Sequence, residues 1–170
     1  PIYSLPSDLT LIRKASDRGA LSEELTAARS TNAGLVPYFT RQEIEEGALK
    51  GRGLEIAYLA DPYDAFVMQV QGSGRVQLPD GQSIRLAYAD QNGHPYRSIG
   101  RYLIDKGELT VAQATAQGIR EWVEAHPART HEVLNFNPSM VFFREKQIVG
   151  ISGCRIDENF ILVSIQIACI

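Results

Sequence analysis

The chain has 170 residues, of which 44% are apolar and 22% charged, and its formal net charge is −3. These values are usual for a soluble globular protein with one ordinary domain, or with one domain and a short appendage. They exclude a general nucleic-acid binder, because affinity for polyanions depends on clustered Lys and Arg, and here 17 basic residues are spread among 20 acidic ones. No apolar run reaches the ~18 residues that a membrane span needs.

The first fifty residues predict short elements. Residues 9–12 read as an extended segment, whereas residues 21–29 have a helix-favouring composition but no apolar stripe. Thr40 and Glu43 have the spacing of a capping box. A short helix is therefore expected to begin at Thr40 and to stop at Gly47.

The middle of the chain predicts strands. Residues 54–59 and 66–70 are apolar runs that contain β-branched and aromatic residues, and residues 75–78 and 83–88 alternate between polar and apolar. A Pro-Asp-Gly turn at 79–81 separates the last two, because Pro fixes φ and Gly supplies a positive φ. We expect a hairpin there, with 66–70 as a further strand of the same sheet.

Beyond this hairpin the apolar period becomes helical. Ser98 can cap a helix that stops at Gly107, and Thr110 begins a second capping-box pattern. The following helix has one apolar face, formed by Ile119, Trp122 and Val123. A shorter helix at 129–134 and a buried strand at 140–144 complete an α+β class: a β-meander or β-barrel-like core with two or three short helices.

The segment at 71–74, Gln-Gly-Ser-Gly, is the most informative local feature. Two glycines around a serine, between two expected strands, let the backbone approach a ligand closely. Gln71 adds an amide whose donors and acceptors suit sugar hydroxyls and acetamido groups. A β-bulge with glycines for conformational reasons alone is the alternative. The expected strand on both sides excludes a nucleophile elbow, which needs a strand followed by a helix.

A second polar segment runs from Asn92 to Ser98 and leads into a helix N-terminus. Free backbone N–H groups at such a terminus suit hydroxyl, carbonyl or carboxylate groups. Arg97 could pair with a lactyl or peptide-stem carboxylate. An ordinary turn plus helix cap, with Arg97 in a surface ion pair, is the alternative.

The sequence gives only weak signals for a catalytic acid or for a metal site. No paired-carboxylate signature of a glycosidase can be identified: Asp61 and Asp64 resemble turn residues, and Asp90 is the most plausible isolated acid. Trp122 is expected in a core rather than as a platform for sugars. The three histidines lack ligand-like spacing, so no metal site is expected.

Five segments, in order, resemble the MltA family of lytic murein transglycosylases. They lie at residues 35–44, 61–66, 69–75, 92–101 and 137–145. Their order and approximate spacing resemble the family over about residues 1 to 145, and five matches in order are hard to obtain by chance.

The resemblance implies murein degradation in the periplasm of Gram-negative bacteria, by a lipoprotein anchored in the outer membrane. Family members cleave the β-1,4 bond between N-acetylmuramic acid and N-acetylglucosamine. The muramyl 6-hydroxyl attacks, a 1,6-anhydro product forms and no water is consumed. A double-psi β-barrel domain carries one aspartate as acid and base, and the glycan lies between this domain and a smaller inserted β domain.

On this resemblance, residues 1–34 are a remnant of the barrel domain and a connecting segment, residues 35–145 are the inserted glycan-binding domain, and residues 146–170 are an unmatched tail. The catalytic aspartate is expected outside this chain, so the chain alone should release no anhydro product. Two alternatives stay open: a glycan-binding module without activity, and an inactive fragment. Cys154 and Cys169, both in the tail, are expected as free thiols, although a disulfide is the alternative.

The substrate contacts expected in this chain come from the two polar segments. They are Gln71, Gly72, Ser73, Gly74, Asn92, Gly93, Tyr96 and Arg97. Amide and hydroxyl groups pair with sugars at close range, and an aromatic edge such as that of Tyr96 covers the apolar face of a sugar ring. The expected partner is the glycan strand of peptidoglycan, with no cofactor, no metal and no nucleic acid, and the protein is expected to be a monomer.

Overall fold

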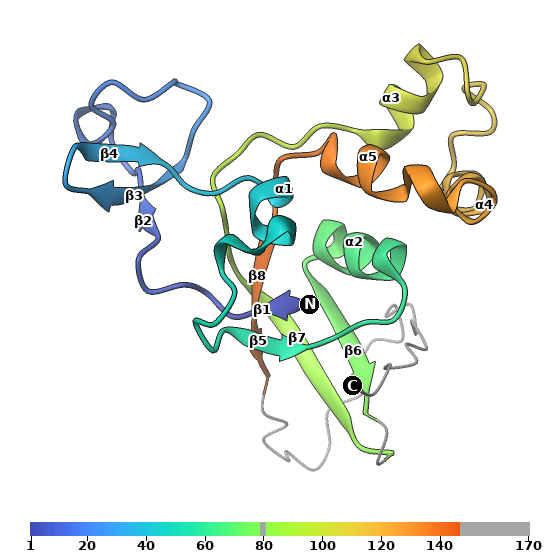
Figure 1. Cartoon of the computed structure of the whole chain (residues 1–170), viewed down its shortest axis with the longest axis horizontal. Helices are drawn as coiled ribbons and strands as arrows, with labels where there is room; N and C mark the ends of the chain where they lie inside the picture. Colours follow the sequence, from blue (N-terminus) through green and yellow to red (C-terminus); the bar gives the residue numbers. More distant parts are fainter. Residues whose placement is uncertain (79–80, 147–170) are drawn as a thin grey trace, which may run out of the picture. The chain divides into compact units, whose positions relative to one another are not determined.

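The computed structural model describes residues 1–78 and 81–146. These residues form five α-helices and three small sheets, which confirms the α+β class (Figure 1). The expected barrel-like core is wrong for this part of the chain, because the sheets are open pieces of two, three and three strands. Helices are also more numerous than the two or three expected. Residues 147–170, with Cys154 and Cys169, lie outside the described residues.

The described chain divides into two compact units. The first contains residues 1–5, 53–90 and the described part from residue 141 onward. The second contains residues 6–52 and 91–140. Each unit is built from segments that are distant in the sequence.

The first unit contains two of the sheets. Their strands are β1 (Ile2–Tyr3) with β5 (Glu55–Ala57), and β6 (Ser73–Gln77), β7 (Ser83–Gln91) and β8 (Val141–Glu145) in that order. β6 and β7 are antiparallel, with Gly74 opposite Leu86, so the predicted hairpin is confirmed. Gly81, the last residue of the predicted turn, has a φ of 82°. The other two residues of this turn, 79 and 80, lie outside the described ranges.

Helix α2 (Pro62–Gln71) stands where a strand was predicted at 66–70. The backbone N–H of Tyr63 donates to the Asp61 carboxylate at 2.7 Å, and Pro62 occupies the first turn. Both features favour a helix start, because the cap satisfies an unpaired N–H and proline has none to satisfy. Asp61 and Asp64 are thus a helix cap and a buried first-turn residue. The strand prediction is wrong because an apolar run this short has no period that distinguishes a strand from a helix.

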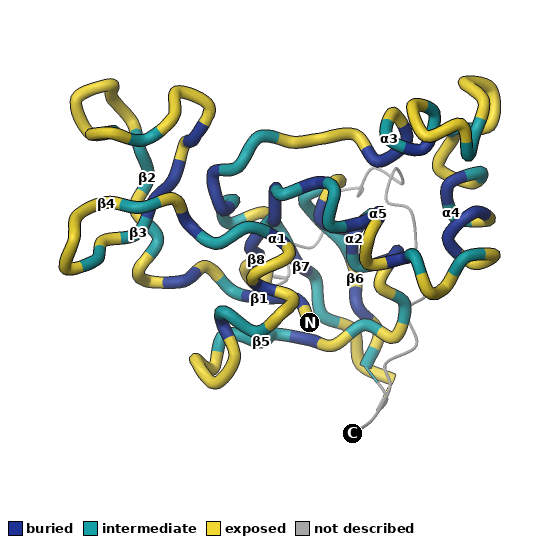
Figure 2. The backbone as a smooth tube through the Cα atoms, turned by 45° about the horizontal axis from the view of Figure 1, so that its top comes forward, coloured by how far each residue is buried: buried dark blue, intermediate teal, exposed yellow. Residues whose placement is uncertain are grey.

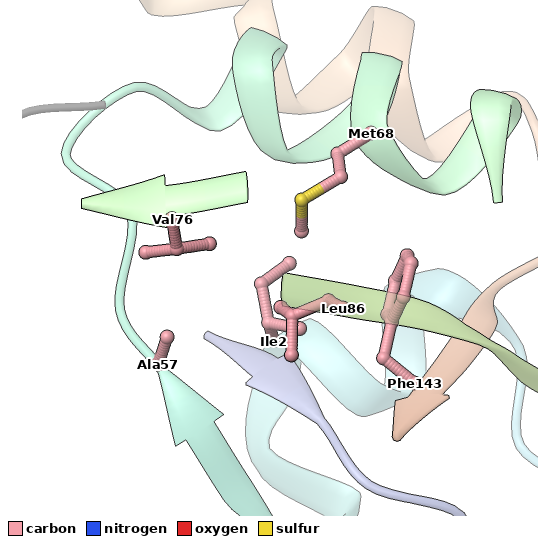
Figure 3. Packing of buried hydrophobic residues seen from close by; sticks show 6 residues of the cluster. All are labelled: Ile2, Ala57, Met68, Val76, Leu86 and Phe143. Atoms are coloured by element: carbon pink, nitrogen blue, oxygen red, sulfur yellow. The ribbon is translucent and has the colours of Figure 1, made fainter. Parts of the chain in front are cut away.

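The core of the first unit lies between α2 and the strands (Figure 3). Met68 points from α2 toward the hairpin, where Gly74 allows close packing: a Cβ at Gly74 would lie 2.6 Å from the Met68 sulfur. The buried cluster is Ile2, Ala57, Met68, Val76, Leu86 and Phe143. Removing these apolar surfaces from water stabilises the unit by ~25 cal/mol per Å².

The second unit combines one sheet with four helices. Its strands are β2 (Thr10–Leu11), β3 (Ala27–Thr31) and β4 (Gly34–Pro37), and its helices are α1 (Arg41–Glu43), α3 (Ile99–Asp105), α4 (Ala116–Ala125) and α5 (Thr130–Asn135). A π-helical turn, Ile44–Ala48, extends α1, and 3-10 turns lie at Ala15–Asp17 and Pro127–Arg129. The segment with helix-favouring composition at 21–29 contributes to strand β3 instead.

Several local predictions in this unit are confirmed. Thr40 and Glu43 form the capping box, with the Thr40 N–H donating to the Glu43 carboxylate at 2.7 Å. Ser98 caps α3. The Thr110–Gln113 pattern forms its expected hydrogen bond, with the Thr110 N–H donating to the Gln113 side-chain oxygen at 3.0 Å, but it does not begin α4. Helix α4 is capped by Thr115, which accepts from the Gly118 N–H at 3.1 Å. Figure 2 shows α4 with alternating buried and exposed positions, as its apolar face requires.

Candidate functional site

The segment at 71–74 lies in the first unit and joins α2 to β6. Gly72 ends the helix with a φ of 72°, and its N–H donates to the Met68 carbonyl at 2.9 Å. A residue with a Cβ is strained at this angle, so the sequence uses glycine. The β-bulge interpretation is therefore wrong: Gly72 is a helix C-cap, and Gly74 is small because Met68 packs on it.

Two polar side chains of this segment remain accessible. Gln71 is exposed at the end of α2, and Ser73 is partly exposed opposite Ala87 in the hairpin. Their amide and hydroxyl groups can donate to and accept from a polar ligand. The order is helix followed by strand, which is the reverse of a nucleophile elbow.

Tyr88 lies beside this segment, and the sequence interpretation missed it. A Cβ built on Gly72 would lie 3.7 Å from the Tyr88 Cβ, and Tyr88 is 44% exposed. Its hydroxyl donates to the Asp90 carboxylate at 3.4 Å. Partial burial and the nearby Asp90 charge raise the pKa of Tyr88. The predicted hairpin contains Tyr88 at the end of its second strand, and the register that pairs Ser73 with Ala87 places Tyr88 beside this segment.

The segment at 92–97 lies in the second unit, and its first residue is fully buried. The Asn92 amide donates to the carbonyls of Phe39 and Pro138, both at 2.8 Å, and accepts from the Met140 N–H at 2.8 Å. All three hydrogen bonds connect segments far apart in the chain. The Asn92 side chain thus holds the loop in place and does not face solvent.

Gly93 is also buried, and its φ is 81°. A Cβ at this position would lie 2.6 Å from the Ala27 Cβ and would collide with the Ala27 backbone. The Gly93 carbonyl accepts from the Thr26 N–H at 3.0 Å. Gly93 is therefore required by the close approach of β3 to this loop.

Tyr96 and Arg97 are the exposed members of this segment, with Tyr96 56% exposed. The Arg97 N–H donates to the Asn137 side-chain oxygen at 3.1 Å, which fixes the backbone of an exposed residue. Ser98 follows as the cap of α3. Among the candidates in this segment, these two side chains can reach a ligand.

Arg41 and Asn137 form a buried polar network that the sequence did not indicate as a site. The Arg41 guanidinium donates to the carbonyls of Asn137 at 3.1 Å and Ser139 at 2.7 Å. Burial lowers the pKa of Arg41 to about 10. Through the bond from the Arg97 N–H to Asn137, this network joins the segments at 35–44, 92–101 and 137–145 into one buried scaffold.

The remaining titratable candidates have structural partners. Asp90 accepts the Tyr88 hydroxyl. His94 Nε2 lies 2.7 Å from the Tyr38 carbonyl, His126 stacks on Trp122 at 4.3 Å between ring centroids, and His131 lies 3.2 Å from Glu45. Trp122 is buried, as expected of a core residue. Across residues 1–78 and 81–146, no group of three His, Cys, Asp or Glu side chains could hold a metal ion.

Comparisons with known proteins give a consistent family match. The family described as "MltA specific insert domain" matches residues 1–144. Membrane-bound lytic murein transglycosylase A of Escherichia coli K12 is 42% identical over 116 residues, which cover 67% of this chain and 32% of that protein.

Solved structures agree in fold. The crystal structure of a membrane-bound lytic murein transglycosylase from Agrobacterium tumefaciens is 38% identical, with a TM-score of 0.81 over 86% of this chain and 41% of that chain. Escherichia coli MltA with bound chitohexaose is 35% identical, with a TM-score of 0.66 over 90% of this chain and 38% of that chain. The chain thus spans about a third of the curated relative's length. Within the described residues, no helix is both long and apolar enough to cross a bilayer.

Proposed function

Because the chain belongs to the MltA family, matching its specific insert domain over residues 1–144, we propose that it supplies the glycan-binding part of a peptidoglycan lytic transglycosylase. The observation that carries this proposal is the likeness, over 90% of the chain, to a relative solved with bound chitohexaose. Chitohexaose is a chain of β-1,4-linked N-acetylglucosamine, so it shares its backbone linkage and acetamido groups with murein glycan.

The accessible residues have the chemistry that such a ligand needs. Gln71 and Ser73 offer an amide and a hydroxyl, and Tyr96 and Arg97 offer an aromatic ring and a cation. We assign glycan contact to these four side chains, of which Gln71 and Ser73 belong to the first unit and the other two to the second. The other four candidates support them: Gly72 and Gly74 by backbone geometry, and Asn92 and Gly93 by holding their loop.

The reaction of the complete protein is part of the proposal. We assign to it cleavage of the bond between N-acetylmuramic acid and N-acetylglucosamine with formation of a 1,6-anhydro product, the catalytic aspartate being supplied outside this chain. The division into residues 1–34, 35–145 and 146–170 stays a prediction. The relatives are named membrane-bound, and we place the complete protein in the periplasm, attached to the outer membrane through a lipid anchor.

Titration of the ¹⁵N-labelled chain with chitohexaose tests glycan binding. Binding by this part alone should be weak, because a flexible saccharide loses entropy on docking. We expect a dissociation constant of roughly 1 mM, near −4 kcal/mol. Gln71→Ala should weaken binding, whereas Gln77→Ala, an exposed glutamine on β6, should not. Shifts confined to residues distant from both polar segments would contradict the assignment.

Incubation with purified sacculi tests the catalytic part of the proposal. The chain alone should release no 1,6-anhydromuropeptides, because loss of a positioned acid and base typically lowers the rate by ~10²–10⁴-fold. Release above a heat-denatured control would show that the chain carries its own acid, and Asp90 and Asp64 would then be the first residues to replace.

A further inference from the structure

Tyr88 is an exposed aromatic residue at a position where the strand pattern favours burial. On β7 it lies two residues after Leu86, and such residues share one face of a strand. Leu86 is 2% exposed and belongs to the core of the first unit, whereas Tyr88 is 44% exposed. The ring thus continues the core face of the hairpin beyond the end of α2.

The neighbour of Tyr88 across the hairpin has no side chain. Ser73 pairs with Ala87, so Gly72 is the next position toward Tyr88. A Cβ at Gly72 would lie 3.7 Å from the Tyr88 Cβ and 3.8 Å from its Cδ2. In most hairpins a cross-strand side chain would contact the ring at this place. Gly72 has no side chain, so the side of the Tyr88 ring that faces it is not covered by residue 72.

The ring is held from its other end. The Tyr88 hydroxyl donates to the Asp90 carboxylate at 3.4 Å, two residues further along β7. At this distance the bond is weak, but it favours one orientation of the side chain before any ligand arrives. A ring that is already oriented loses less conformational entropy on binding.

We propose that Tyr88 is a stacking platform for one pyranose ring of the glycan, beside the polar amide of Gln71. This inference rests on the proposed function. The C–H face of a pyranose is apolar and flat enough to lie on an aromatic ring, while its hydroxyl and acetamido groups project from the edge. Gln71, which precedes Gly72 and is exposed, supplies an amide for those groups, whereas Ser73 pairs with Ala87 and its side chain lies on the other face of the hairpin.

The test compares three variants of Tyr88 with one matched control. Tyr88→Ala removes the ring, Tyr88→Leu keeps apolar bulk without an aromatic face, and Tyr88→Phe keeps the ring without the hydroxyl. The control is Tyr58→Ala, because Tyr58 lies in the same unit and is 46% exposed. Chitohexaose affinity and the upfield shifts of its ring protons are measured by NMR, and dispersed amide spectra identify folded variants.

We expect Tyr88→Ala and Tyr88→Leu to weaken binding about five- to ten-fold and to abolish the upfield shifts, in line with the energies of aromatic contacts. Tyr88→Phe and Tyr58→Ala should stay within about two-fold of the parent chain. If Tyr88→Ala fails to fold, Tyr88→Leu decides the question.

Other outcomes overturn the inference. Equal losses in Tyr88→Phe and Tyr88→Ala would show that the hydroxyl matters and the ring does not. Unchanged affinity in Tyr88→Leu, with a loss in Gln71→Ala, would overturn the platform alone, leaving Tyr88 as a surface for another part of the protein. No saccharide binding by the parent chain would overturn the platform together with the proposed function.

Discussion

Replacing Asn92 by alanine removes a fully buried amide that holds three segments of the second unit together. The Phe39 carbonyl and the Met140 N–H would each lose the hydrogen bond that the amide provides. The Pro138 carbonyl would keep its bond from the Arg41 N–H at 3.0 Å. A buried polar group left unpaired costs about 1–3 kcal/mol, so two such groups predict a loss of about 2–6 kcal/mol in the free energy of unfolding.

Urea denaturation monitored by fluorescence measures this loss. Trp122 is the only tryptophan of the chain and is buried in the second unit, so its emission reports on that unit. Asn32→Ala is the matched control, because Asn32 is exposed in the turn between β3 and β4, and its loss should stay below about 0.5 kcal/mol. A loss under about 1 kcal/mol for Asn92→Ala would refute the assignment of Asn92 as a structural anchor.

Two further predictions concern the same unit. Gly93→Ala should lower the free energy of unfolding by about 2–5 kcal/mol, because the strain of a side chain in the left-handed backbone region adds to a collision with Ala27. A variant as stable as the parent chain would contradict the close approach of Ala27 to Gly93. Hydrogen bonds from Arg129 lower the pKa of Glu132 to about 2, so its stabilising contribution is complete above its ordinary value of 4.5 and is lost as the pH falls toward 2. In urea titrations at pH 5 and pH 3, Glu132→Gln should therefore be less sensitive to pH than the parent chain, and equal sensitivity would contradict the ion pair.

Local signals were sufficient for most elements. The capping box at Thr40, the Ser98 cap and the hairpin each depend on residues close together in the chain, so their hydrogen bonds can be inferred from spacing. At α2 two local signals conflict. Asp61 with Pro62 marks a helix start and Gly72 a helix stop, whereas the apolar run between them favours a strand, and the helix signals prevail.

Residue identity and order are enough to indicate the family and the two polar segments, because both can be identified without any contact between distant residues. Which residues of those segments reach solvent depends instead on how the folded chain packs. Arg41 donates to Asn137, 96 positions away, and Asn92 donates to Phe39, 53 positions away. The sequence does not show whether a polar residue binds a ligand or forms hydrogen bonds with buried backbone N–H and C=O groups. Its partners depend on how distant segments pack against each other.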